Sequence, residues 1–126
     1  MELKSKQELP NQTPVASLIA EAWALLRQNR IEDAAAIFEQ ILQKDAKDVD
    51  AYYGQGLALR ASDKKDAAIE SFQKALEVSR KLLAEIRSHY GSDETRSSLE
   101  TTDDDRYMML DRMISQRLAE LGVATE

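Results

Sequence analysis

Cysteine is absent from the sequence, and histidine occurs once, as His89. Without cysteine the chain can form no disulfide, no thiolate nucleophile and no zinc site held by sulfur, and one histidine cannot supply a two-imidazole metal site. Glycine and proline are also scarce, with 4 and 2 residues in a chain of 126. Because turns depend on these residue types, a fold of many short strands is not expected. The composition predicts one small, helix-rich domain.

Long hydrophobic runs are missing as well. No segment approaches the roughly 20 apolar residues that a membrane-spanning helix needs. The first twelve residues are mostly polar and do not contain the apolar core of a signal peptide. We therefore expect a cytoplasmic protein. The formal net charge of −6 argues against nucleic acid or an anionic membrane as partner, because both attract basic patches.

Apolar residues recur at helical spacing in five segments that polar breaks separate. The predicted helices span residues 14–28, 31–44, 49–61, 65–90 and 105–121, after a tail at 1–13 and with an acidic linker at 91–104. No glycine or proline interrupts the fourth helix before Gly91, so it should reach about 37 Å. The aspartates at 103–105 are expected to start the last, amphipathic helix, where carboxylates complement the helix dipole. Gly122 is expected to end that helix.

A shift of 34 residues superimposes two blocks of the sequence. Ala34 then meets Ala68, and Phe38 meets Phe72. The other apolar matches are Leu18 with Tyr52, Ala22 with Gly56, Leu25 with Leu59, and Leu42 with Leu76. These are the positions that a pair of antiparallel helices must bury, so the spacing predicts two similar helical hairpins at about 15–48 and 49–82.

The second block resembles the tetratricopeptide repeat (TPR) family. Tyr52 stands in the place of the family's first tryptophan, Gly56 is its glycine, and Ala68 and Phe72 are its small and aromatic pair. The first block is a weaker match, and both blocks lack the closing proline. A third repeat is absent, because Thr102 and Arg106 stand where Ala68 and Phe72 would recur. The resemblance implies an all-α superhelix of two hairpins, with an extended fourth helix and a C-terminal capping helix.

The resemblance also implies a concave inner face, formed by the first helix of each repeat, on which family members bind peptides or helices. The inner-face residues of this chain would be Ile19, Trp23, Leu26, Arg27, Tyr53, Leu57 and Arg60. They could equally be core residues, because a helix that is apolar all round is a buried one. In either case Ile19, Trp23 and Tyr53 need a cover, since exposed apolar patches of this kind are rare in monomers.

Three occupants could provide that cover. The chain's own C-terminal helix is favoured, because two repeats are fewer than a stable array of this kind needs. A second copy would make a homodimer, which light scattering across concentration would reveal. The third occupant is a helix or peptide of a partner protein.

The family's acidic-peptide clamp is not expected in this chain. Ile19, Trp23 and Gly54 occupy positions where that clamp needs lysine or asparagine. We therefore expect a ligand to dock mainly through apolar contacts, with Arg27 and Arg60 available for an acidic flank.

Catalytic constellations are not apparent in the sequence. His89 stands alone near the end of the fourth helix, and the run at 103–105 lacks the glycine-centred spacing of a calcium loop. Gly54 and Gly56 lie inside a helix, where close packing explains them better than a phosphate loop does. We expect no enzyme, metal or cofactor. The expected function is a non-catalytic protein-interaction module such as an adaptor, scaffold or co-chaperone-like protein, and the alternative is a self-associating structural protein.

Overall fold

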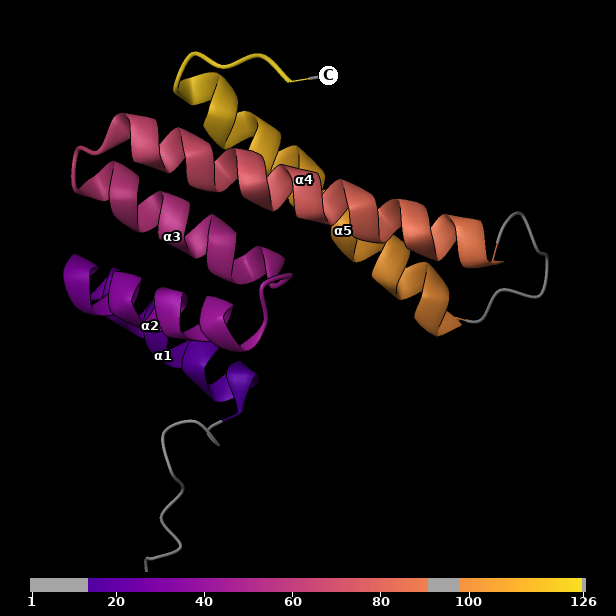
Figure 1. Cartoon of the computed structure of the whole chain (residues 1–126), viewed down its shortest axis with the longest axis horizontal. Helices are drawn as coiled ribbons and strands as arrows, with labels where there is room; N and C mark the ends of the chain where they lie inside the picture. The colour runs from indigo at the N-terminus through magenta and orange to yellow at the C-terminus, as the bar shows by residue number, and fades with distance from the viewer. Residues whose placement is uncertain (1–13, 91–97, 126) are drawn as a thin grey trace, which may run out of the picture.

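The computed structural model describes residues 14–90 and 98–125. Five helices, α1 (Val15–Arg27), α2 (Ile31–Lys44), α3 (Val49–Ala61), α4 (Lys65–Tyr90) and α5 (Ser98–Glu120), follow one another through the stack. α1 and α2 lie at one end of the molecule, α3 lies in the middle, and α4 and α5 lie at the other end (Figure 1). The described residues contain no strand. The predicted all-α class is confirmed.

The turns that follow α1 and α3 have the same backbone conformation, so the 34-residue repeat is present in the turns as well as in the side chains. Asn29 and Asp63, which are 34 residues apart, have φ angles of 64° and 62°. In both turns the next residue donates its N–H to the carbonyl five residues earlier, at 2.9 Å. This bond satisfies a helix-end carbonyl, and asparagine and aspartate tolerate the left-handed conformation that it needs. Two of the polar breaks predicted from the sequence, between α1 and α2 and between α3 and α4, are therefore the turns inside the hairpins.

Each hairpin is built around one phenylalanine, and both phenylalanines are fully buried. Phe38 packs with α1 and α3, and Phe72 packs with α3, α4 and α5. A Cβ on Gly54 would lie 2.1 Å from Phe38 Cζ, and a Cβ on Gly56 would lie 2.6 Å from Phe72 Cε1. The two glycines thus let α3 approach both rings, which confirms the close packing expected of them.

The last helix begins earlier than predicted. α5 starts at Ser98, so residues 98–104 are helical and the predicted linker boundary at 104 is wrong, while residues 91–97 lie outside the described part. The aspartates at 103–105 lie inside the helix instead of at its first turn. The sequence carries a signal for the earlier start that composition hid, because Ser97 and Glu100 have the spacing of a capping box.

The C-terminal end of α5 has the predicted glycine geometry. Gly122 has a φ of 88° and donates its N–H to the carbonyl of Ala119 at 3.0 Å. Val123 donates to the carbonyl of Leu118 at 2.9 Å and packs against the core around Phe72. This pair of bonds and the apolar contact form the left-handed helix end that favours glycine.

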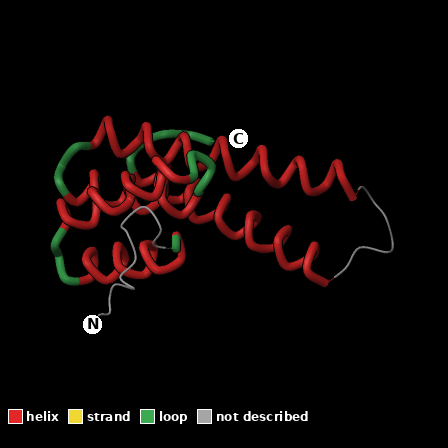
Figure 2. The backbone as a smooth tube through the Cα atoms, turned by 60° about the horizontal axis from the view of Figure 1, so that its bottom comes forward, coloured by secondary structure: helices red, strands yellow, loops and turns green. Residues whose placement is uncertain are grey.

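α5 runs antiparallel to α4 and parallel to α3. The second half of α4 and the first half of α5 project together beyond the other helices (Figures 1 and 2). Near the start of α3, Asp50 pairs with Arg106, and near its end Arg60 pairs with Glu120 at 2.8 Å. Because both pairs keep the same order along the two helices, α5 runs in the direction that the first helix of a third repeat would have.

Asp48 begins α3 as its N-cap, and its side chain accepts the Ala51 N–H at 2.9 Å. Burial raises the pKa of Asp48 above its ordinary value of 3.8, although the bond from Ala51 and the charge of Arg106 oppose this. The folded state therefore binds this proton more tightly than the unfolded state does. Its contribution to stability is complete below 3.8 and is lost as the pH rises through the raised folded pKa.

We predict that Asp48→Asn removes this pH dependence and keeps the cap, because asparagine caps helices as well as aspartate does. Urea unfolding should be measured at about four pH values between pH 3 and pH 7. Wild type should lose stability relative to the variant as the pH rises above 3.8. A constant difference across this range would show that folding does not raise the pKa of Asp48. Asp48→Ala serves as the control and should cost about 1 kcal/mol, because it removes the cap.

Candidate functional site

The seven residues predicted for the inner face lie on α1 and α3, and α5 divides them into two groups. Tyr53 is only 8% exposed. It shares the core around Phe72 with the buried α5 residues Ile114 and Leu118, and Leu57 packs against the same core. The part of the inner face that belongs to α3 is therefore covered by the chain's own last helix.

Trp23 connects the two hairpin cores. Its ring centroid lies 5.3 Å from that of Phe38, in an edge-on arrangement, and 6.3 Å from that of Tyr53. Tyr53 in turn lies 5.7 Å from Phe72. Aromatic pairs at these separations add to the stability gained from burial alone. This half-buried residue is thus part of the joint between the repeats, as the core interpretation of these residues proposes.

Arg60 is held by α5. Its guanidinium lies 2.8 Å from one carboxylate oxygen of Glu120, and Arg117 lies 2.8 Å from the other. Burial raises the pKa of the Tyr53 hydroxyl nearby, while the charges of Arg117 and Arg60 oppose the shift and Glu120 adds to it. A ligand carboxylate at Arg60 would have to compete with Glu120.

The α1 part of the predicted site remains at the surface. Ile19 and Leu26 are half-buried against the core around Phe38, and Arg27 is exposed. Ala16, near the start of the same helix, is exposed as well. α1 therefore presents apolar and basic groups that no other described helix covers completely.

The seam between α4 and α5 contains residues that sequence reasoning did not single out for this role. Arg80 donates two hydrogen bonds to the carboxylate of Asp111, at 2.7 and 3.3 Å. The hydroxyl of Ser79, which is nearly inaccessible, donates to the carbonyl of Tyr107 at 3.4 Å. Arg80 occupies the position of the family's closing proline, so the residue that lets α4 continue also binds α5.

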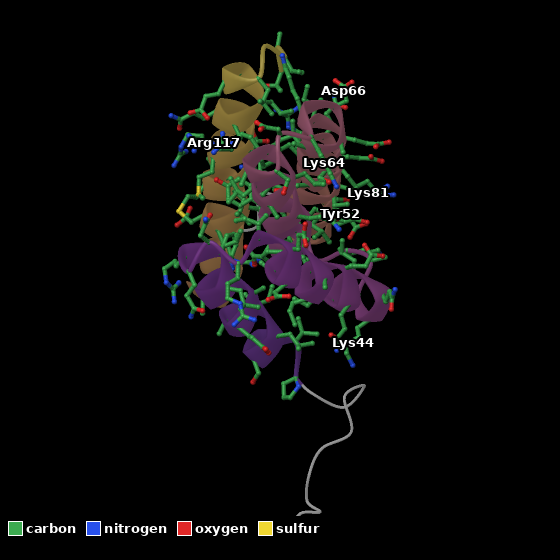
Figure 3. The ribbon with its side chains drawn as sticks, turned by 90° about the vertical axis from the view of Figure 1, so that its left-hand side faces the viewer. Lys44, Tyr52, Lys64, Asp66, Lys81 and Arg117 are labelled. Atoms are coloured by element: carbon green, nitrogen blue, oxygen red, sulfur yellow. The ribbon has the colours of Figure 1, made fainter. Side chains whose placement is uncertain are left out.

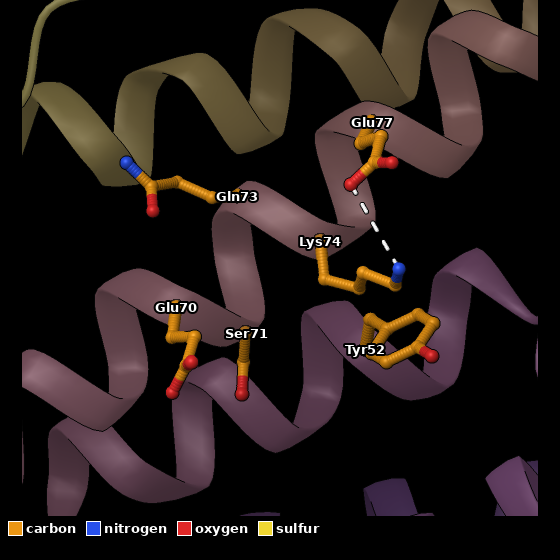
Figure 4. A pocket seen from close by; sticks show the side chains of 6 residues that line it. All are labelled: Tyr52, Glu70, Ser71, Gln73, Lys74 and Glu77. Carbon is orange, nitrogen blue, oxygen red and sulfur yellow. Dashed lines mark ion pairs between the residues drawn. The ribbon is translucent and has the colours of Figure 1, made fainter.

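The face of the molecule opposite Arg117 is hollowed around Tyr52 (Figure 3). One cavity of about 430 Å³ is lined by Tyr52, Glu70, Ser71, Gln73, Lys74 and Glu77. Figure 4 shows Lys74 above the Tyr52 ring, with its amine 3.8 Å from Glu77. A second cavity of about 210 Å³ shares Tyr52 and reaches further along α4. Tyr52, Lys44 and Lys81 lie on one side of the molecule and Arg117 on the other (Figure 3).

Three further cavities lie at the α1–α2 turn, at the C-terminal end of α5 and beside the second half of α4. None of the five is lined by the seven predicted inner-face residues. Among the described residues, no three acidic or histidine side chains are grouped so as to hold a metal ion. No helix in residues 14–90 and 98–125 combines the length and apolar character that crossing a bilayer requires.

A sequence profile of tetratricopeptide repeat proteins matches residues 19–81, which is half of the chain and runs through most of α1 to α4. The chain belongs to the tetratricopeptide repeat family. The resemblance expected from the 34-residue spacing is thereby confirmed, and so is the TPR-like arrangement of the helices. A TPR chain is a protein-interaction module, which is the broader form of the function expected from the sequence.

Similar TPR segments occur in much longer proteins. The chain is 35% identical over 54 residues to the probable UDP-N-acetylglucosamine–peptide N-acetylglucosaminyltransferase SPINDLY of Arabidopsis thaliana. It is 37% identical over 60 residues to the protein of the same description from Solanum lycopersicum. The matches span 43% and 48% of this chain but 6% of each relative. No solved structure matches the chain significantly.

Proposed function

We propose that this TPR chain is a non-catalytic adaptor that binds a peptide or helix of another protein on the inner face of α1. The observation that carries the proposal is the division of the inner face by α5. That helix covers Tyr53 and Leu57 and engages Arg60, while Ile19 and Leu26 keep part of their apolar surface exposed. The ligand surface is the part of the face that the chain leaves open.

The chemistry of α1 defines the kind of partner. Ile19 and Leu26 offer apolar contacts, and Arg27 supplies one exposed positive charge at the end of the helix. An apolar ligand residue next to a carboxylate would match both features. The partner is proposed to be a cytoplasmic protein rather than nucleic acid or a membrane, and the glycosyltransferase activity named for the relatives is not part of the proposal.

One observation supports the alternative of self-association, and another weakens it. The groove is filled in part by the chain's own helix, as that alternative allowed. Because α5 folds back within the same chain, however, a second copy is not needed to cover Tyr53. We therefore favour the adaptor role, and the homodimer stays a prediction.

Selection of a displayed peptide library against the full chain tests the adaptor role. Selected peptides should lose at least tenfold in affinity for the variant Ala16→Glu/Arg27→Glu, because it places two new carboxylates on the open face of α1, and tenfold corresponds to about 1.4 kcal/mol. The matched control is Ala36→Glu/Arg112→Glu, which makes the same charge change at exposed positions of α2 and α5. Equal affinity for both variants would contradict the proposed surface.

A further inference from the structure

The cavity around Tyr52 is completed by the part of α4 that continues beyond the family's closing position. Its walls are Ala46 and Lys47 on the turn between α2 and α3, Tyr52 on α3, and a stretch of α4 that continues to Leu82 and Glu85. The predicted repeat ends at about residue 82, and the family's closing position is Arg80. A helix that stopped at the family's closing position would leave the cavity without its far wall. The pocket is thus completed by the same helix extension that receives α5 on the other side of α4.

The size of this cavity fits a single side chain. Its volume is about 210 Å³, which is below the roughly 300–1,000 Å³ of pockets that hold whole small molecules. Its floor is apolar, with the half-buried ring of Tyr52, the buried side chain of Val78 and the half-buried side chain of Leu82. A leucine or phenylalanine side chain of a peptide has the matching size and polarity.

The charged rim of the cavity favours an acidic neighbour for that side chain. Three of the six lysines in the described residues line it, Lys47, Lys74 and Lys81. The two carboxylates of the lining belong to Glu77 and Glu85, so the rim is positive by one charge in a chain whose net charge is −6. Glu77 pairs with Lys74 at 3.8 Å, and the other two lysines, Lys47 and Lys81, are exposed.

The neighbouring shallow cavity has the opposite charge balance. It shares Tyr52, Lys74 and Glu77 and adds Glu70 together with the polar Ser71 and Gln73. Glu70 and Lys81 are eleven residues apart on α4, or about 16 Å along the helix, which corresponds to about five residues of extended peptide. The two cavities share part of their lining and form one groove, whose rim changes from positive near Lys81 to negative near Glu70.

We infer that this groove is a second peptide-docking surface, separate from the face of α1. It takes an extended segment whose leucine or phenylalanine side chain enters the cavity at Tyr52. An acidic residue next to this anchor faces Lys47 and Lys81, and a basic residue further along faces Glu70. The site therefore recognises a charge order as well as an apolar anchor.

An NMR titration of the full chain with a synthetic peptide tests the inference. The probe is Ac-Glu-Phe-Gly-Ser-Gly-Lys-NH2, and the controls carry alanine in place of phenylalanine or exchange glutamate and lysine. The probe should shift the backbone amides of Ala46, Lys47, Tyr52 and Leu82 in a saturable way at millimolar concentration. Both control peptides should bind at least several-fold more weakly.

Two charge-matched variants test the residues. Lys47→Glu/Lys81→Glu should weaken the probe by about tenfold, because two favourable contacts become repulsive. Lys64→Glu/Lys65→Glu makes the same change at exposed positions near the start of α4 and should bind the probe as wild type does. Ala46→Trp, at an exposed turn position, should block the cavity and abolish the shifts while the circular dichroism spectrum is preserved.

Several results would overturn the inference. One is the absence of saturable shifts, and another is equal binding of the alanine or charge-exchanged peptide. Shifts that instead centre on Ile19 and Trp23 would assign the probe to α1. They would remove the second surface and leave the proposed adaptor face in place.

Discussion

Replacing Ile114 by alanine should lower the free energy of unfolding of the whole chain by about 2–5 kcal/mol. Ile114 is fully buried and belongs to the same core as Phe72 and Tyr53. Truncation removes apolar contacts and leaves a cavity between three helices, so the loss exceeds the transfer free energy of the missing atoms. Urea denaturation followed by circular dichroism would measure it.

Met109→Ala is the matched control for this prediction. Met109 lies on the same helix but is 47% exposed, so its truncation should change stability by no more than about 0.5 kcal/mol. A small and equal effect of both substitutions would show that α5 is not packed against the second repeat. A large effect of Ile114→Ala alone would show that the last helix belongs to the folding unit.

Gly54→Ala should destabilise the chain by about 1–3 kcal/mol, even though alanine favours a helix by about 1 kcal/mol over glycine. The added Cβ would lie 2.1 Å from Phe38 Cζ, and the fully buried ring has no room to move. Steric overlap with a closely packed ring therefore outweighs the gain in helix propensity. Thermal and urea unfolding would both record the loss.

A double-mutant cycle separates this cause from others. Phe38→Leu removes the ring that the new Cβ meets, so Gly54→Ala should cost less in that background, with a coupling of about 0.5–3 kcal/mol. Gln55→Ala lies between the two glycines and removes only an exposed hydrogen bond to Glu39, so it should stay within about 0.5 kcal/mol of wild type. Additive effects in the cycle would rule out the contact as the cause.

The two hairpins could be predicted from the sequence because their information is local and repeated. Ala34 and Ala68, or Phe38 and Phe72, are read at a fixed spacing, and the left-handed turns at Asn29 and Asp63 follow the same period. Each of these signals lies within one hairpin, and each occurs twice. Because these signals are repeated, the helices, their order and the family could all be predicted from the sequence.

The arrangement of α5 was harder to predict from the sequence. The sequence signal for its early start is a single capping-box spacing inside an acidic, serine-rich stretch whose composition is typical of linkers. Its contacts join residues far apart in the chain, such as Arg60 and Glu120, which are 60 residues apart, and no periodicity indicates such a pair. Arg60 was therefore predicted to be available to a ligand, whereas the structure engages it within the chain.

The Tyr52 groove could not be predicted for a related reason. Tyr52 was identified as the counterpart of a family core residue, and Lys47, Lys74 and Lys81 look like ordinary exposed lysines along helices and turns. The cavity lies where the α2–α3 turn and Tyr52 meet α4, and its lining on α4 extends from Lys74 to Glu85. Absence of a closing proline predicts the longer helix, but not what its extra turns enclose.

The central claim is that α5 completes the second repeat as a stable part of one cooperative fold. Native-state hydrogen exchange tests it most directly, because the amides of residues 110–118 can be compared with those of α3 and α4 in one experiment. We predict that these amides exchange with an opening free energy equal to that of the α3 and α4 core, since all three helices share the cluster around Phe72. Exchange of residues 110–118 at the rate of an unstructured peptide, while α3 and α4 stay protected, would contradict the account.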